Sequence, residues 1–164
     1  MTTSDALTAI HVAISLLAIA SGLVAVAELV RDRRSESWSA IFLATTLATS
    51  VTGFFFHSKA IGPPHIVGAL SLLILALAMW ALYVRKLDGA WRSVYVVSAV
   101  VALYLNVFVG VVQAFQKIGS LHQLAPKGSE PPFVVAQLAV LIAFAALGIC
   151  AVRRFRNGHP FLSS

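Results

Sequence analysis

The chain has 164 residues, of which 59% are hydrophobic and only 11% are charged. A soluble domain is roughly half apolar and about a quarter charged, so this composition excludes an ordinary soluble domain and indicates an integral membrane protein. The formal net charge of +6 does not indicate a nucleic-acid partner, because the basic residues form short clusters between apolar runs. The single cysteine, Cys150, excludes an intramolecular disulfide.

Five apolar runs follow one another along the chain, each about 20 residues long and so long enough to cross a bilayer as a helix. The first is not expected to be a cleaved signal peptide, because it is too long and no Lys or Arg precedes it. The sequence therefore predicts an all-α fold, with residues 1–164 forming a single transmembrane domain built as a bundle of five transmembrane helices. The predicted spans are residues 6–30, 38–57, 65–84, 93–115 and 133–152.

The connections between these spans are short, with one exception. Proline pairs at residues 63–64 and 131–132 predict the starts of the third and fifth helices, because proline fits the first helical turn. Residues 117–132 form the longest connection, and connections of this length in a compact domain are often functional. Within it, a short interfacial turn over the bundle is predicted from Leu121, Leu124 and Ala125.

Lys and Arg residues are distributed unevenly between the two sides of the predicted bundle. Nine of the 12 lie in connections 31–37 and 85–92 and in the tail after residue 152, and these include every arginine. The positive-inside rule then places the N-terminus outside and the C-terminus in the cytoplasm. At the inner end of the first helix, Glu28 is expected to pair with Arg31, one turn away.

Polar side chains gather in the half of the bundle that this orientation places outside. The first and fourth helices carry them on stripes of small residues, and the fifth carries Gln137. The stripe on the second helix runs through Thr46, Ser50, Gly53 and His57, and histidines flank the turn between the second and third helices. Polar groups inside a bilayer are costly, so they tend to pair or to line a pocket. We expect an outward-opening pocket whose ligand-binding residues are His11, His57, His65, Asn106, Gln113 and Gln137.

Three kinds of ligand fit these residue types. Imidazole is the commonest transition-metal ligand, so His11, His57 and His65, with His122 above them, would suit copper or zinc. Two histidines from different helices would instead clamp the iron of haem b. A quinone would accept hydrogen bonds from a His or Gln donor between aromatic walls. The candidate walls are Phe54, Phe55, Phe56, Phe108, Phe115 and Phe133, although most of these are expected to face lipid.

The combination of His11 with His57 or His65 resembles the pattern of small bacterial membrane cytochromes of the b561 type. That resemblance implies a haem held between antiparallel helices near the outer face. The chain departs from the family in its fourth helix, which has Asn106 and Gln113 where the family places a histidine, so no second haem is implied. Residues 106–137 also resemble small bacterial multi-spanning membrane proteins of unknown function, which implies a multi-pass protein of the bacterial cytoplasmic (inner) membrane.

The sequence contains no motif that names a reaction, such as a phosphate-binding glycine loop or a His-Glu-x-x-His run. The first hypothesis is therefore a membrane protein that binds haem, a transition metal or a quinone for redox chemistry or ligand handling. The second is a non-catalytic membrane subunit or scaffold, in which the stripes only pack helices. A small channel or transporter is the third. The expected partners are the lipid bilayer and either further copies of the chain or a larger membrane complex.

Overall fold

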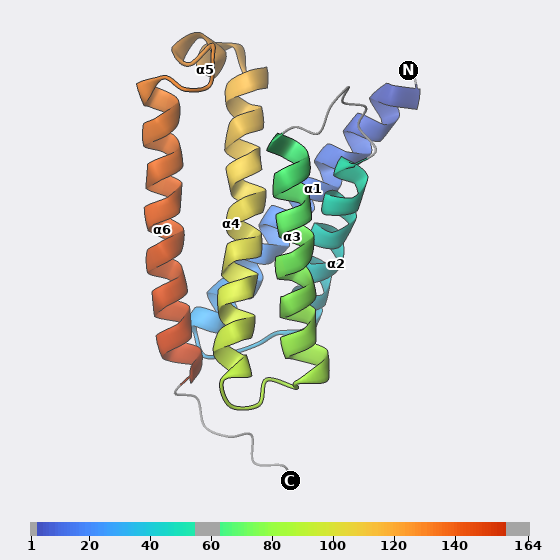
Figure 1. Ribbon diagram of the computed structural model, residues 1–164, viewed down its shortest axis with the longest axis vertical. Helices are drawn as coiled ribbons and strands as arrows, with labels where there is room; N and C mark the ends of the chain where they lie inside the picture. Colours follow the sequence, from blue (N-terminus) through green and yellow to red (C-terminus); the bar gives the residue numbers. More distant parts are fainter. Residues whose placement is uncertain (1–2, 55–62, 157–164) are drawn as a thin grey trace.

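The computed structural model describes residues 3–54 and 63–156, and the described residues form helices joined by short connections (Figure 1). The predicted all-α fold is thereby confirmed. The elements are α1 (Thr3–Val30), α2 (Glu36–Gly53), α3 (Pro63–Met79), its π-helical continuation η1 (Trp80–Val84), α4 (Trp91–Lys117), α5 (Gly119–Leu124) and α6 (Pro131–Arg156).

Four of these helices are long and apolar enough to cross a membrane. They contain the segments Ala6–Val30, His65–Val84, Trp91–Lys117 and Pro131–Phe155. The helix α2 is not among them, because seven of its 18 residues are serine or threonine. It ends at Gly53, and residues 55–57 of the predicted second span lie outside the described residues.

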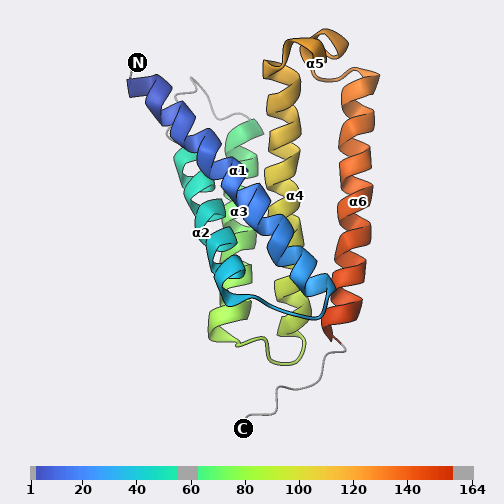
Figure 2. The ribbon, with the colours of Figure 1, turned by 180° about the vertical axis from the view of Figure 1, so that it is seen from behind.

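The helices form a bundle of four with a fifth added at its edge. Neighbouring pairs in the bundle are α1 with α2, α2 with α3, α3 with α4 and α4 with α1, and α6 packs against α4. Figure 2 shows that α1 crosses the bundle diagonally, beginning beside α2 and ending beside α6. None of the most apolar 18-residue window of α6 is buried, so this helix turns much of its surface to the surroundings.

The two ends of the bundle differ in both chemistry and packing. We call the end with connections 31–35 and 85–90 and the last turn of α6 the arginine end, and the opposite end the histidine end. The apolar core lies toward the arginine end, where the end of α1, the start of α2, the end of α3 and the start of α4 meet. Its fully buried large side chains are Val26, Leu29, Phe42, Leu75, Tyr95, Val96 and Leu103.

The connections follow the local chemistry that the sequence predicts. Pro63 begins α3 and Pro131 begins α6, as expected for proline in a first helical turn. The predicted turn in the long connection is confirmed as α5, which lies over the ends of α4 and α6 (Figure 1). The predicted pair is also present: Arg31 Nη1 lies 3.4 Å from Glu28 Oε1. Because the Arg31 side chain is 70% exposed, this pair contributes little to stability.

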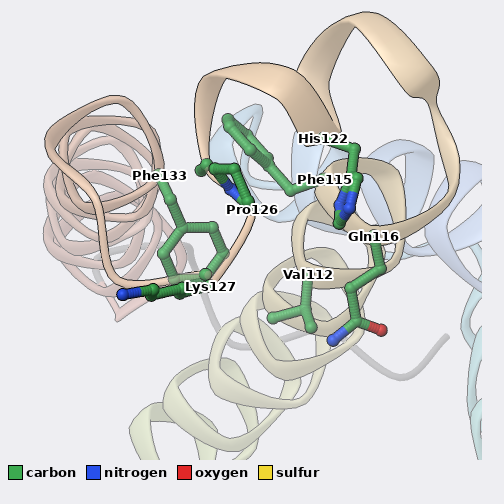
Figure 3. Close-up of a pocket in the computed structure, with 9 residues that line it drawn as sticks. Val112, Phe115, Gln116, His122, Pro126, Lys127 and Phe133 are labelled. Atoms are coloured by element: carbon green, nitrogen blue, oxygen red, sulfur yellow. The ribbon is translucent and has the colours of Figure 1, made fainter.

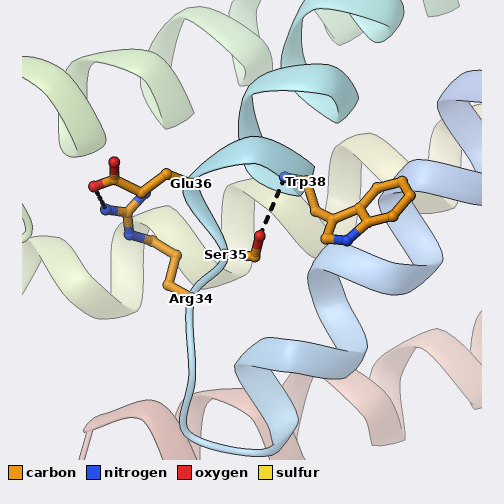
Figure 4. Close-up of polar contacts among 4 residues, drawn as sticks. All are labelled: Arg34, Ser35, Glu36 and Trp38. Atoms are coloured by element: carbon orange, nitrogen blue, oxygen red, sulfur yellow. Dashed lines mark hydrogen bonds and ion pairs between the residues drawn. The ribbon is translucent and has the colours of Figure 1, made fainter.

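The turn from α1 to α2 is shaped by polar contacts at the arginine end (Figure 4). The Ser35 side chain caps α2 by accepting a hydrogen bond from the Trp38 N–H at 3.4 Å. On the other side of Ser35, Arg34 Nη2 donates to Glu36 Oε1 at 2.8 Å. An N-cap serine satisfies one of the N–H donors left open at a helix start, so this contact favours the start of α2 at this point.

The helices approach one another closely in the core at Gly22 of α1. A Cβ atom added at this glycine would lie 2.7 Å from both Leu103 Cδ1 and the Phe42 ring. Both of those side chains are fully buried and have little freedom to move. The absence of a side chain at residue 22 therefore allows α1 to lie directly against α2 and α4.

Replacing Gly22 with alanine is expected to lower the free energy of unfolding by about 1–3 kcal/mol, because the added methyl group overpacks a rigid core. Gly110→Ala is the matched control, since a Cβ there would lie 3.5 Å from Ile19 Cδ1, at ordinary contact distance. Reversible unfolding of both variants by SDS in mixed micelles measures the difference. Equal stability of the two variants would contradict the tight packing inferred at Gly22.

Candidate ligand site at the histidine end

His11 lies in the third turn of α1, and its ring forms a hydrogen bond with α2. His11 Nδ1 is 2.8 Å from Thr52 Oγ1. The Thr52 hydroxyl has one proton, which it donates to the Ala48 carbonyl oxygen at 2.7 Å. A hydroxyl oriented in this way accepts from His11 in the tautomer that carries its proton on Nδ1. In that tautomer, Nε2 bears the lone pair that accepts a proton or binds a metal ion.

The contacts around His11 continue along the interface between α1 and α2. Ser15, one turn further along α1, donates to the His11 carbonyl oxygen at 2.7 Å, and its Oγ is 3.5 Å from Thr49 Oγ1. Gly53 lies beside the imidazole, since a Cβ atom there would be 3.8 Å from His11 Cε1. The ring is thus bounded on the α2 side by one hydroxyl and by backbone without a side chain.

His65 lies on the other side of the same helix end. Its ring meets the ring of Phe54 edge-on, with centroids 5.8 Å apart and an interplanar angle of 62°. The Phe54 ring also covers Gly68, where an added Cβ would be 3.2 Å away. His11 and His65 therefore flank the C-terminal end of α2 from α1 and α3. The third predicted ligand of this group, His57, lies outside the described residues.

Two of the predicted polar residues lie on the face of α4 that turns toward α1 and α2. Asn106 Nδ2 donates to Thr46 Oγ1 at 3.0 Å, across the diagonal of the bundle, and Thr46 is fully buried. Gln113, two turns further along α4, is exposed because α1 has by then diverged from α4 (Figure 2).

Gln137 and His122 lie in a different part of the histidine end. Gln137 Nε2 donates to the Phe108 carbonyl oxygen at 3.2 Å, which joins α6 to α4, and its buried Oε1 has no partner among the described residues. His122 is on α5, which lies over α4 and α6, on the far side from the start of α1 (Figures 1 and 2). Among residues 3–54 and 63–156, no three His, Cys, Asp or Glu side chains come close enough to hold a metal ion.

The residue that sequence reasoning missed is Thr52. The stripe identified on the second helix runs through Thr46, Ser50 and Gly53, whereas the side chain that fixes His11 belongs to the neighbouring stripe of Thr45, Thr49 and Thr52. The signal was present, because residues at i, i+4 and i+7 share one helix face. A helix packed between two neighbours uses both stripes, and the sequence does not show which one meets α1.

Replacing Thr46 with valine is expected to lower the free energy of unfolding by about 1 kcal/mol, as for other hydrogen bonds between membrane helices, because Asn106 loses its acceptor. Thr45→Val is the control, since the Thr45 hydroxyl bonds only to the carbonyls of Ile41 and Phe42 in its own helix. The measurement is the same SDS titration. A cost at Thr45 as large as that at Thr46 would show that the bond across the diagonal adds nothing.

The geometry at this end can next be set beside known proteins. The chain matches no model of a protein family, no curated protein and no solved structure. The function proposed below therefore rests on the contacts of the described residues.

Proposed function

We propose that this protein crosses the bacterial cytoplasmic membrane five times and binds a haem or a transition-metal ion through His11. In this arrangement the N-terminus is outside, the C-terminus is cytoplasmic and the histidine end faces outward. The orientation is supported by the nine basic residues at the arginine end, since Lys and Arg are retained on the cytoplasmic side of spanning helices. The site would serve either redox chemistry at the bound group or the handling of that group as a ligand.

The fifth crossing in this proposal is α2. Its hydroxyl groups would be costly in lipid if they had no partners, but they find partners within the bundle. Thr45 and Thr52 donate to carbonyls one turn earlier in α2, and Thr46 accepts from Asn106. Packed between α1 and α3, this 18-residue helix extends over about 27 Å, close to the thickness of a bilayer core.

The single observation that carries the ligand assignment is the hydrogen bond from His11 to Thr52. Histidines that bind metals usually donate their other ring N–H to an oxygen, which fixes the tautomer and the ring orientation. The proposal assigns this arrangement to His11, with Nδ1–H directed to Thr52 and the lone pair on Nε2. A quinone carbonyl requires a donor, so the neutral ring suits a haem iron or metal ion better than a quinone. The further ligand in this proposal is His57 or His65, the two alternatives that the b561-type resemblance also implies.

His11→Ala is expected to abolish binding of the ligand, and Thr52→Val to weaken it roughly 10- to 100-fold by releasing the ring, as loss of such a supporting contact does at other metal sites. The absorption spectrum of the purified protein detects a haem, and elemental analysis detects a metal. Titration of the stripped protein with haemin or the metal then gives the affinities of the variants.

Thr49→Val is the matched control, because the Thr49 hydroxyl lies near Ser15 and not at the imidazole. It is expected to bind as the unaltered protein does. A purified protein that is colourless and free of metal, and that takes up neither haemin nor metal, would refute the proposal. Ligand retained at full affinity in His11→Ala would equally exclude His11 as its anchor.

A non-catalytic membrane subunit or scaffold is the alternative, and one observation favours it. The helix α6 packs on α4 and on the end of α1, and it leaves large apolar side chains such as Val135 and Ile142 more than 60% exposed. Such a surface suits contact with another membrane subunit as well as with lipid. A small channel or transporter remains the third possibility. Loss of the bound ligand without loss of partner proteins in His11→Ala would separate the first two functions.

Labelling of single cysteines tests the five crossings and their orientation. In a Cys150→Ser background, a membrane-impermeant maleimide applied to spheroplasts is expected to label Ser58→Cys and Ser120→Cys. It is expected to label Arg33→Cys and Asp88→Cys only after permeabilisation. Ser58 lies outside the described residues and reports on the far end of α2. Protection of Ser58→Cys together with Arg33→Cys would show that α2 does not cross, and the opposite labelling pattern would invert the orientation.

A further inference from the structure

A cavity of about 150 Å³ lies beneath the connection between α4 and α6, apart from His11 and His65 (Figure 3). Its walls come from the last turns of α4, from α5 and the residues after it, and from the start of α6. Val112, Phe115 and Phe133 form the apolar part, with the two phenylalanine rings meeting edge-on at 5.4 Å between centroids. An apolar cavity of this volume accepts one benzene-sized ring.

The polar part of the lining consists of side chains that donate hydrogen bonds. Gln116 and His122 lie together on one side of the cavity, and Lys127 lies on the opposite side (Figure 3). No carboxylate lines the cavity. None of these three side chains makes a hydrogen bond to another residue in the described part of the chain. A group that enters the cavity meets Gln116 and His122 on one side and aromatic surface beside them. The Lys127 ammonium points outward in Figure 3, and this exposed side chain can turn toward the group from the other side.

The connection above the cavity is built by its own hydrogen bonds. Ala125, which is 2% exposed, donates its N–H to the Leu121 carbonyl oxygen, and the Gly128 N–H donates to the Ala125 carbonyl oxygen. The Glu130 carboxylate accepts the N–H groups of Lys127 at 2.9 Å and Ser129 at 3.0 Å. The bond from the Lys127 N–H is the main reason that the pKa of Glu130 is held below its usual value. The Glu130 carboxylate is thus engaged by backbone N–H groups of the connection and not by the side chains that line the cavity.

We propose that this cavity binds the ring of a quinone, with hydrogen bonds from His122 or Gln116 to one carbonyl oxygen and from Lys127 to the other. A quinone ring has the size of the cavity, two acceptor oxygens on opposite sides and an apolar plane between them. The cavity also lies at the end of an apolar span, where the ring of a membrane-dissolved quinone meets polar groups. This site is separate from the proposed His11 site and does not depend on it. It requires binding alone, without electron transfer.

The test uses full-length protein in lipid nanodiscs and a decyl-substituted benzoquinone, with binding measured by titration calorimetry. His122→Ala is expected to weaken binding about threefold to tenfold through the loss of one hydrogen bond. Val112→Phe is expected to weaken it more than about tenfold, because the ring fills a cavity sized for one benzene. The matched controls are Gln123→Ala and Val109→Phe, at neighbouring exposed residues that do not line the cavity. Both controls are expected to bind as the unaltered protein does.

Photolabelling with an azidoquinone is expected to mark residues 112–133. The proposal is overturned if His122→Ala and Val112→Phe both bind as tightly as their controls, or if the label marks another segment. Complete competition by inorganic phosphate or by anionic lipid would overturn it in favour of an anion site. His11→Ala is expected to leave quinone binding unchanged, so failure here and failure of the proposed haem or metal site are distinguishable.

Discussion

The constraint on which the structure depends is that a group capable of hydrogen bonding needs a partner inside the protein when lipid surrounds it. The long helices satisfy their backbone groups internally, and the hydroxyls that interrupt their apolar surface are satisfied by the same helices. Ser21 donates to the carbonyl of Leu17, and Thr45 and Thr52 do the same in α2. Only a few polar side chains remain for contacts between helices. Examples of those contacts are His11 to Thr52, Asn106 to Thr46 and Gln137 to the Phe108 carbonyl oxygen, and each joins two helices.

The division between the two ends follows from how the helices meet. At the arginine end Gly22 allows close approach, and large side chains such as Phe42 and Leu103 fill the space. Toward the histidine end α1 diverges from α4 (Figure 2), and polar contacts such as His11 to Thr52 join helices beside ring contacts such as Phe54 to His65. A packed core resists deformation, whereas a region joined by few contacts opens at lower cost. The candidate sites lie in this second region, on helices whose other ends are fixed.

Much of the fold was predictable because its causes are local. Apolar runs, proline pairs and the spacing of Glu28 and Arg31 depend on a few neighbouring residues, and the helices, their starts and this ion pair are confirmed. The helix α2 is less apolar than the other predicted spans. This difference is also local, because it follows from the serines and threonines in its own sequence.

The candidate site was predictable only in part, because its geometry depends on how helices cross. A polar stripe identifies a helix face, but not the neighbour that the face meets. The diagonal course of α1 brings His11 to Thr52, a residue that no stripe singled out. It also leaves Gln113 exposed, whereas the packing of α6 on α4 directs Gln137 to the Phe108 carbonyl oxygen. The cavity under α5 depends on the path of a connection, which residue spacing does not specify.

The diagonal course of α1 has a consequence for how the protein fits bilayers of different thickness. With 28 residues, α1 is about 42 Å long, whereas the 18 residues of α2 extend over about 27 Å. Inclination reconciles the long helix with a hydrocarbon layer of about 30 Å, because tilting shortens its projection on the membrane normal. A thicker layer would favour a more upright α1, and the Gly22 contact would act as the pivot. His11 lies three turns from Gly22. A change in the inclination of α1 about Gly22 would therefore move His11 relative to Thr52 and alter their hydrogen bond.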